Sequence, residues 1–260
     1  MRRLILISLG LSLGLSGCDR PEPVQVVIEK EPSVDGLVET VMDGGGTFSD
    51  VRFASLIETS TGNRVLAFDP NQPAEAEILA GIRAAMDRIL EEFNRPDSIT
   101  HQERRINEVS AYFEEALLEE INREPGLVCE LPRTSEGNLQ RSGYPDLVIL
   151  HQASGRVAYL DPKLVEETSM DSSLRTFYFT PRRETNKVLH DAHHLLIGIE
   201  HDGNNRKWKY LRWNLVDLAD FRVTLKAEFQ ANNRDLYRPE LIVIQEEAEL
   251  EESGGVGEGE

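Results

Sequence analysis

The sequence contains few cysteines and few long apolar runs. Its two cysteines, Cys18 and Cys129, are too few for a disulfide framework or a cysteine metal cluster. After residue 15, no apolar run approaches the ~20 residues that a membrane-spanning helix requires. Because 40% of its residues are apolar, the chain can instead be stabilised by an ordinary hydrophobic core.

Motifs of several enzyme classes are also missing. The sequence has neither a G-x-S-x-G nucleophile elbow nor a P-loop. His190, His193 and His194 have the i, i+3, i+4 spacing of one helix face, but there is no H-E-x-x-H zinc motif. We therefore interpret these histidines as ordinary polar groups rather than as metal ligands.

Positive charge is scarce over the whole chain. A net charge of −18 argues against a polyanionic partner. The distribution is uneven, however, because residues 133–238 carry 16 Lys and Arg against 14 Asp and Glu. Basic clusters lie at Arg182-Arg183 and between Arg206 and Arg212. A chain with this distribution can still carry a basic groove.

The first 18 residues have the pattern of a secretory signal. Arg2 and Arg3 precede the apolar run Leu4–Leu15. The ending Leu15-Ser16-Gly17-Cys18 resembles the lipobox of bacterial lipoproteins, which implies lipidation of Cys18. We expect a lipid-anchored protein of the bacterial cell envelope, facing the periplasm or the exterior. The alternatives are a membrane-spanning anchor or a signal with an unmodified cysteine.

The rest of the chain divides by composition into three parts. Residues 19–50 are rich in Pro, Glu and Gly, which predicts a flexible stalk. Residues 51–244 form one predicted domain, with its core at about 100–230. Residues 245–260 are predicted to be an acidic, disordered tail.

Alternation of helix and strand signals in the domain predicts an α/β fold. An N-terminal β-hairpin is expected from Val51–Thr59 and Arg64–Phe68, joined by a turn at residues 60–63. Apolar residues at helical spacing predict two helices, Pro73–Phe93 and Thr100–Asn122. Further strands are expected at 127–131, 144–151, 156–164, 175–179, 195–200 and 207–214. A loop is expected at 135–142 and a helix at 184–194. The segment 215–229 is ambiguous, with helix favoured at its start.

The strands at 144–151 and 156–164 are predicted to form one antiparallel hairpin. A turn centred on Ala153 and Ser154 places Asp146 opposite Asp161, and alternation puts Lys163 on the same face. Two opposed carboxylates repel, and one ammonium offsets only part of their charge. A divalent cation with oxygen ligands, Mg²⁺ or Mn²⁺, would satisfy both carboxylates. The alternative is a surface hairpin closed by an ordinary salt bridge.

These residues resemble a known superfamily. Pro145-Asp146, 14 intervening residues and Asp161-Pro162-Lys163 resemble the PD-(D/E)xK phosphodiesterases, the restriction-endonuclease-like nucleases. The resemblance implies a mixed β-sheet core flanked by helices and a Mg-dependent endonuclease. It further implies that Asp146, Asp161 and the Pro162 carbonyl bind the metal, and that Lys163 assists the attacking water.

The superfamily usually adds an acidic residue from the preceding helix. Glu114 fits this position because it shares the inward helical spacing of Leu117 and Ile121, although Glu115 and Glu119 are rivals. The implied partner is nucleic acid, above all DNA, and homodimers are common among such enzymes. The alternatives are a catalytically inactive nuclease-fold lipoprotein that acts as a binding or structural module, and a cytoplasmic restriction-type enzyme without a true signal.

Three further groups could contact nucleic acid. Lys187 or His190 could reach a phosphate from the helix expected after the motif, and Arg182-Arg183 could bind an anion near its start. Trp208, Tyr210 and Trp213 alternate with basic residues as in a single-strand platform. We interpret the period-two aromatics instead as one buried face of a strand.

Overall fold

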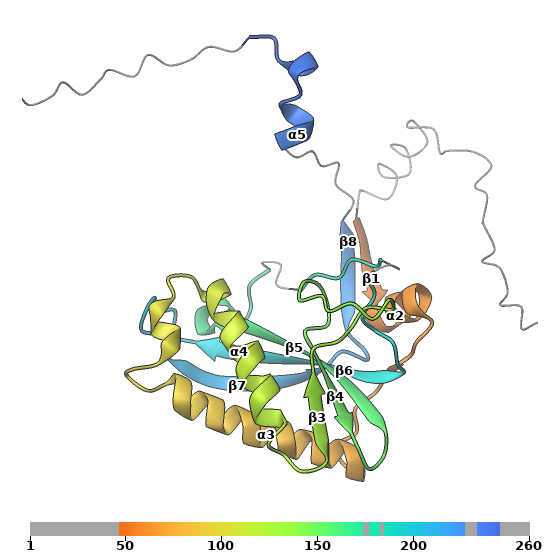
Figure 1. Ribbon diagram of the computed structural model, residues 1–260, viewed down its shortest axis with the longest axis vertical. Coiled ribbons are helices and arrows are strands. Elements are labelled where there is room, and N and C mark those ends of the chain that lie inside the picture. The colour runs from red at the N-terminus through yellow and green to blue at the C-terminus, as the bar shows by residue number, and fades with distance from the viewer. Residues whose placement is uncertain (1–46, 174–176, 183–184, 227–232, 245–260) are drawn as a thin grey trace, which may run out of the picture. The chain divides into compact units, whose positions relative to one another are not determined.

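The computed structural model describes residues 47–173, 177–182, 185–226 and 233–244 (Figure 1). The signal with Cys18, almost all of the predicted stalk and the tail at 245–260 lie outside the described residues. No helix in the described ranges combines the length and the apolar character that crossing a membrane requires.

A mixed sheet of six strands forms the centre of the described fold. Its order is β2-β6-β5-β4-β3, with β7 also paired to β6. β3, β4 and β5 pair antiparallel, β5 and β6 pair parallel, β2 pairs parallel with β6, and β6 pairs antiparallel with β7. The strands are β2 (Val65–Leu66), β3 (Leu127–Glu130), β4 (Leu147–His151), β5 (Arg156–Glu166), β6 (Ala192–His201) and β7 (Tyr210–Asp217).

A smaller antiparallel pair and several helices complete the described fold. β1 (Thr47–Arg52) pairs with β8 (Arg222–Lys226). The α-helices are α2 (Phe53–Thr61), α3 (Pro73–Phe93), α4 (Ile106–Ile121) and α5 (Asn233–Leu236), and the short 3₁₀ turns are η1 (Ile99–Gln102), η2 (Glu167–Ser169) and η3 (Pro239–Leu241). Because β1 begins at residue 47, the domain starts four residues earlier than its composition predicted.

The helices α3 and α4 form a layer over one face of the sheet (Figure 1). Their apolar residues recur three or four apart and are buried against alternate residues of the strands. α3 also approaches β3 very closely at Gly81. A Cβ at this position would lie 2.3 Å from Leu127 Cδ1. On β5, Ala158 and Leu160 join this core.

A second core covers the opposite face. Tyr159 lies between Ala158 and Leu160 on β5, so its side chain points the other way. There it packs in a cluster that includes Phe53 and Ile57 of α2. Phe53 contacts five aromatic or histidine rings, those of Tyr144, Phe177, Phe179, His194 and Phe221. This second core supports the strands from which the candidate site projects.

The predicted N-terminal hairpin is wrong. Phe53 and Ile57 are four residues apart and both fully buried, and this spacing forms the inward stripe of α2. The predicted turn is the end of that helix: Gly62 adopts φ +77° and its N–H donates to the Glu58 carbonyl. A left-handed glycine after the last turn is a common way to end a helix.

The predicted helix at 184–194 is also wrong. Residues 185–191 are irregular, and Ala192 already belongs to β6. β6 is paired on both sides, and nearly all its residues are buried, so it lacks the alternation of a half-exposed strand. The helix favoured at the start of 215–229 is wrong as well, because residues 215–217 continue β7.

Two other boundaries differ from the prediction. The second long helix begins at Ile106, and the start of the predicted range is the 3₁₀ turn η1, which ends at Gln102. The described residues of the strand expected at 175–179 are Phe177–Phe179, and they are not in a strand. The rings of Phe177 and Phe179 pack on Phe53, which accounts for the two phenylalanines of this segment.

Candidate active site

The β4–β5 hairpin has the register that the sequence predicted. Val148 pairs with Tyr159, and Leu147 pairs with Leu160. Asp146 immediately precedes β4 and Asp161 follows Leu160, so the two carboxylates are neighbours at the open end of the hairpin. Lys163 lies two residues further along β5 and therefore on the same face as Asp161.

These three side chains form a compact charged cluster. Lys163 Nζ lies 2.6 Å from Asp161 Oδ2 and 3.6 Å from Asp146 Oδ2. The Asp161 side chain is 4% exposed, against 15% for Asp146 and 32% for Lys163. The cluster is therefore open to solvent on the lysine side and closed beneath Asp161.

Burial and mutual charge perturb the cluster. Burial, reinforced by Asp146, raises the pKa of Asp161 to about 7 although Lys163 opposes the shift. For Lys163, burial alone would lower the pKa. The charges of Asp161, Asp146 and Glu114 outweigh burial, so the pKa of Lys163 is raised. The lysine therefore stays an ammonium at neutral pH.

Among the three candidate glutamates of α4, Glu114 faces the cluster. It is half-buried, and its pKa is raised by burial and then by the charge of Asp146. Glu115 is exposed and pairs with Arg141 at 3.4 Å, while Glu119 is exposed to solvent. α4 thus places Glu114, rather than its neighbours, toward the hairpin.

Lys187 adds a second buried ammonium near the same carboxylates. It is 2% exposed, and its Nζ donates to the Gln140 carbonyl at 3.2 Å. Burial lowers the pKa of Lys187, while Asp146, Asp161 and Glu114 oppose the shift. His190, the other residue predicted to reach a phosphate, is exposed. The irregular segment before β6 therefore brings Lys187, buried, toward the carboxylates.

A tyrosine that the sequence analysis did not single out lies beneath the site. The Tyr144 hydroxyl is hydrogen-bonded to His194 Nδ1 at 2.7 Å. Burial lowers the pKa of His194 to about 3, and burial followed by the charge of Asp161 raises the pKa of Tyr144 well above its usual value. Both side chains are thus neutral near pH 7. Only the position of Tyr144, two residues before Asp146, could have pointed to it.

The other residues that the sequence analysis named do not join the charged cluster. Trp208 and Tyr210 are buried, which confirms a core face rather than a platform for bases. His193 Nε2 contacts Glu75 Oε1 at 3.2 Å and joins β6 to α3. Arg182 is exposed, and Arg183 lies outside the described residues.

The donor set of the cluster suits a hard divalent cation. Asp146, Asp161 and the Pro162 carbonyl supply oxygen ligands, and that carbonyl lies 3.4 Å from Lys163 Nζ. Asp161 Oδ2 is buried and receives no well-directed hydrogen bond, although Lys163 is close. In the conformation described, no three His, Cys, Asp or Glu side chains of the described residues converge on one point. The lysine lies between the two aspartates.

The fold and the site together define a restriction-endonuclease-like nuclease. A mixed sheet flanked by helices presents Asp146, just before β4, beside the Asp161-Pro162-Lys163 sequence within β5, next to a glutamate from α4. Comparison with known proteins agrees, since a profile of the Type II restriction enzyme MjaV family matches residues 47–240. The chain belongs to that family.

A restriction enzyme shows the same relationship over most of its length. The chain is similar to the Type II restriction enzyme MjaV of Methanocaldococcus jannaschii, with 26% identity over 207 residues. The similarity covers 76% of this chain and 89% of that enzyme. The profile match begins at residue 47, where β1 also begins.

Proposed function

We propose that the chain is a metal-dependent endonuclease that hydrolyses phosphodiester bonds in DNA. The observation that carries the proposal is the convergence of Asp146, Asp161 and Lys163 at one end of the hairpin. Membership of a restriction-enzyme family supports DNA as the substrate.

Each residue has a role that its surroundings suit. Asp146, Asp161 and the Pro162 carbonyl would hold Mg²⁺ or Mn²⁺, and Glu114 would bind it directly or through water. A bound ion of this kind stabilises negative charge on a phosphate and lowers the pKa of a bound water. Binding the ion also offsets the repulsion between the buried carboxylates.

Lys163 would act on the attacking water. Its ammonium remains charged at neutral pH, as its raised pKa requires. Once the aspartates bind a cation, the three N–H donors of Lys163 are free to orient the water and to contact the scissile phosphate. These donors also stabilise the charge that develops on the phosphate oxygens.

Lys187 would be a positioning residue. It is too buried to meet DNA directly, but its charge opposes the three carboxylates and its hydrogen bond holds the loop at Gln140. With Lys163 it reduces the net charge of the cluster from −3 to −1. This balance limits repulsion of the incoming phosphate.

The test uses supercoiled plasmid and the full chain. We expect cleavage in Mg²⁺, none in chelator, and loss of cleavage in Asp146→Asn, Asp161→Asn and Lys163→Met. Asp87→Asn, an exposed carboxylate of α3, should cleave as the wild type does. Wild-type rates in the three site variants, each shown by its melting curve to be folded, would refute the assignment.

We also propose a membrane-tethered form of the enzyme. The lipobox at Leu15–Cys18 supports it. Incorporation of a fatty-acid analogue by the wild type but not by Cys18→Ala would agree with lipidation. Equal labelling of both would contradict it and favour a cytoplasmic restriction-type enzyme or an unlipidated signal.

The alternative is a nuclease fold that has kept its shape but lost its activity and serves as a binding module. An inactive site of that kind should not bind the cation. A rise in melting temperature on addition of Mg²⁺, absent in Asp161→Asn, would therefore argue against it.

A further inference from the structure

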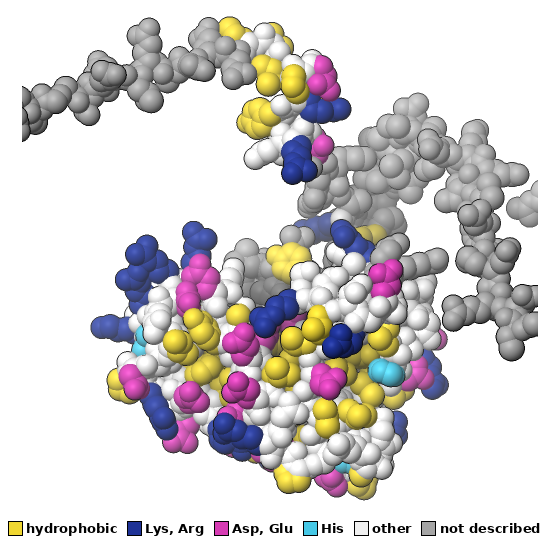
Figure 2. Space-filling model, viewed as in Figure 1, with side chains coloured by type: hydrophobic (Ala, Val, Ile, Leu, Met, Phe, Trp, Pro, Cys, Tyr) yellow, Lys and Arg dark blue, Asp and Glu magenta, His cyan; other side chains and the backbone are white. Residues whose placement is uncertain are grey.

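Five cations lie together in two segments outside the candidate active site. Arg104 and Arg105 precede α4, and Arg206, Lys207 and Lys209 lie in the β6–β7 turn; we call these five residues the basic corner. All five are exposed. Within the described ranges none of them pairs with a carboxylate. Figure 2 shows Lys and Arg side chains projecting over the start of α4 and this turn.

Hydrogen bonds hold the β6–β7 turn against the chain that leads into α4. His101 Nε2 is 3.1 Å from the Trp208 carbonyl. The Asn94 side chain binds the backbone of Tyr210 twice, donating to its carbonyl at 2.9 Å and accepting from its N–H at 2.8 Å. Trp208 is buried and packs edge-on against His201. These contacts hold the backbone that carries the exposed lysines on either side of Trp208.

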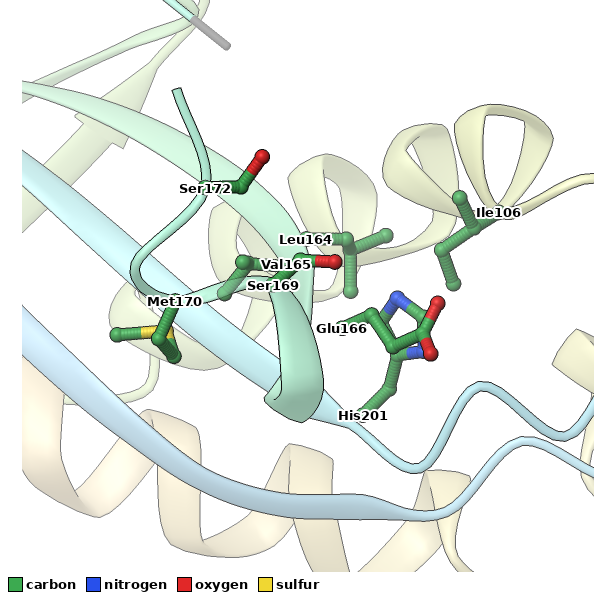
Figure 3. A pocket seen from close by; sticks show the side chains of 8 residues that line it. All are labelled: Ile106, Leu164, Val165, Glu166, Ser169, Met170, Ser172 and His201. Atoms are coloured by element: carbon green, nitrogen blue, oxygen red, sulfur yellow. The ribbon is translucent and has the colours of Figure 1, made fainter. Parts of the chain in front are cut away.

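A cavity lies next to the two segments that carry the basic corner. It has a volume of about 230 Å³ and is lined by Ile106, which follows Arg105, by His201, which precedes the turn, and by Leu164–Glu166 (Figure 3). Glu166 is three residues beyond Lys163 on β5, a distance of roughly 10 Å along an extended strand. A DNA strand advances about 3.4 Å per nucleotide along the helix axis, so this distance along the β5 backbone corresponds to about three nucleotides.

The carboxylates near the basic corner are already engaged. Glu103 accepts a hydrogen bond from the Tyr112 hydroxyl at 2.9 Å. Asp202 accepts from the backbone N–H groups of Asn204 and Lys209. Glu166 lies next to His201 within the cavity. Glu108 accepts a hydrogen bond from the Arg105 backbone N–H at 3.3 Å. Five cations against four carboxylates, Glu103, Glu108, Glu166 and Asp202, leave the corner slightly basic on a chain whose net charge is −18.

We propose that the basic corner binds the DNA backbone beside the scissile phosphate. The inference rests on the proposed function, since it assumes that the substrate is DNA. Electrostatic contacts of this kind are made to phosphates, so they position the duplex without reading its sequence. An acidic protein needs such a local basic surface to bring a polyanion to its site.

The test measures DNA binding by the full chain in chelator, where no cleavage occurs, as a function of salt concentration. Each phosphate contact contributes about 0.9 to the slope of log K against log salt. Lys207→Gln/Lys209→Gln should therefore reduce the slope by about 2, and so should Arg104→Gln/Arg105→Gln. The loss should be similar for DNA of different sequences. The control is Arg52→Gln/Arg222→Gln, two exposed arginines of the β1–β8 sheet, which should leave the slope unchanged.

The outcomes separate this inference from the proposed function. A wild-type chain that neither binds nor cleaves DNA would overturn both. A wild-type chain that binds and cleaves DNA, with unchanged slopes in both basic-corner variants, would overturn the basic corner alone. Melting curves check folding, and the single exposed substitution Lys207→Gln, with an expected slope loss of about 1, replaces any pair that does not fold.

Discussion

The ionisation of Asp161 should destabilise the fold when no metal is bound. In the folded chain burial raises the pKa of this residue to about 7, against an ordinary value of 3.8. Between these values the folded chain binds more protons than the unfolded chain. The free energy of unfolding must therefore fall as pH rises from about 4 to about 7. The substitution Asp161→Asn introduces an amide that is uncharged at any pH, so it should remove this loss.

The size of the effect follows from the pKa difference. Each unit corresponds to about 1.4 kcal/mol, so the shift sets an upper limit of about 4 kcal/mol above pH 7. Lys163 keeps Asp146 as a partner at 3.6 Å in the variant, so it is not left as an unpaired charge. At 2–4 °C per kcal/mol, this upper limit corresponds to a melting temperature of Asp161→Asn about 8–16 °C above that of the wild type.

Thermal melting in chelator from pH 5 to pH 8.5 measures this effect, with Asp87→Asn as a control. The advantage of Asp161→Asn should be greatest above pH 7 and shrink toward pH 4. Added Mg²⁺ should raise the melting temperature of the wild type and leave that of Asp161→Asn unchanged. If Asp161→Asn melts below the wild type at pH 8 in chelator, the pair with Lys163 is a net stabilising salt bridge and the reasoning is refuted.

Substitutions at three other positions test the site and the core. Lys187→Met should bind Mg²⁺ roughly tenfold more tightly than the wild type, because a nearby positive charge is removed. It should nevertheless cleave plasmid more slowly, and Lys187→Arg should restore part of the rate. Calorimetry and plasmid cleavage test this prediction, and weaker metal binding by Lys187→Met would contradict it. Glu114→Gln should weaken metal binding in calorimetry with little change in melting temperature, whereas Glu119→Gln should alter neither. Gly81→Val should lower stability by about 1–3 kcal/mol, because the added carbons meet Leu127; an unchanged denaturation midpoint would show that β3 can move aside.

The sequence predicted the register of the hairpin because its determinants are local. Alternating apolar residues on either side of a polar turn set the register of β4 and β5, and that register alone brings Asp146 opposite Asp161. The family resemblance added the roles of Pro162 and Lys163. The long amphipathic helix α3 was equally predictable, since its boundaries, Pro73 and Phe93, match the prediction.

The errors arose where distant contacts decide the structure. β6 is paired on both sides with other strands, so it carries no alternating pattern of apolar residues. His193 and His194 imitate helical spacing only together with the exposed His190, which precedes the strand. His193 is bonded to Glu75 and to the Leu66 carbonyl, and His194 Nδ1 to Tyr144; none of these partners is near its histidine in sequence. The placement of Lys187 likewise depends on the loop that contains Gln140.

The most direct test of the central claim is plasmid cleavage by the full chain in Mg²⁺, compared between the wild type and Asp161→Asn. Both proteins should melt as folded chains, so a difference in rate reports on the site. The account predicts cleavage by the wild type that chelator abolishes, and no cleavage by Asp161→Asn. Equal cleavage by the two proteins, or cleavage that persists in chelator, would contradict it.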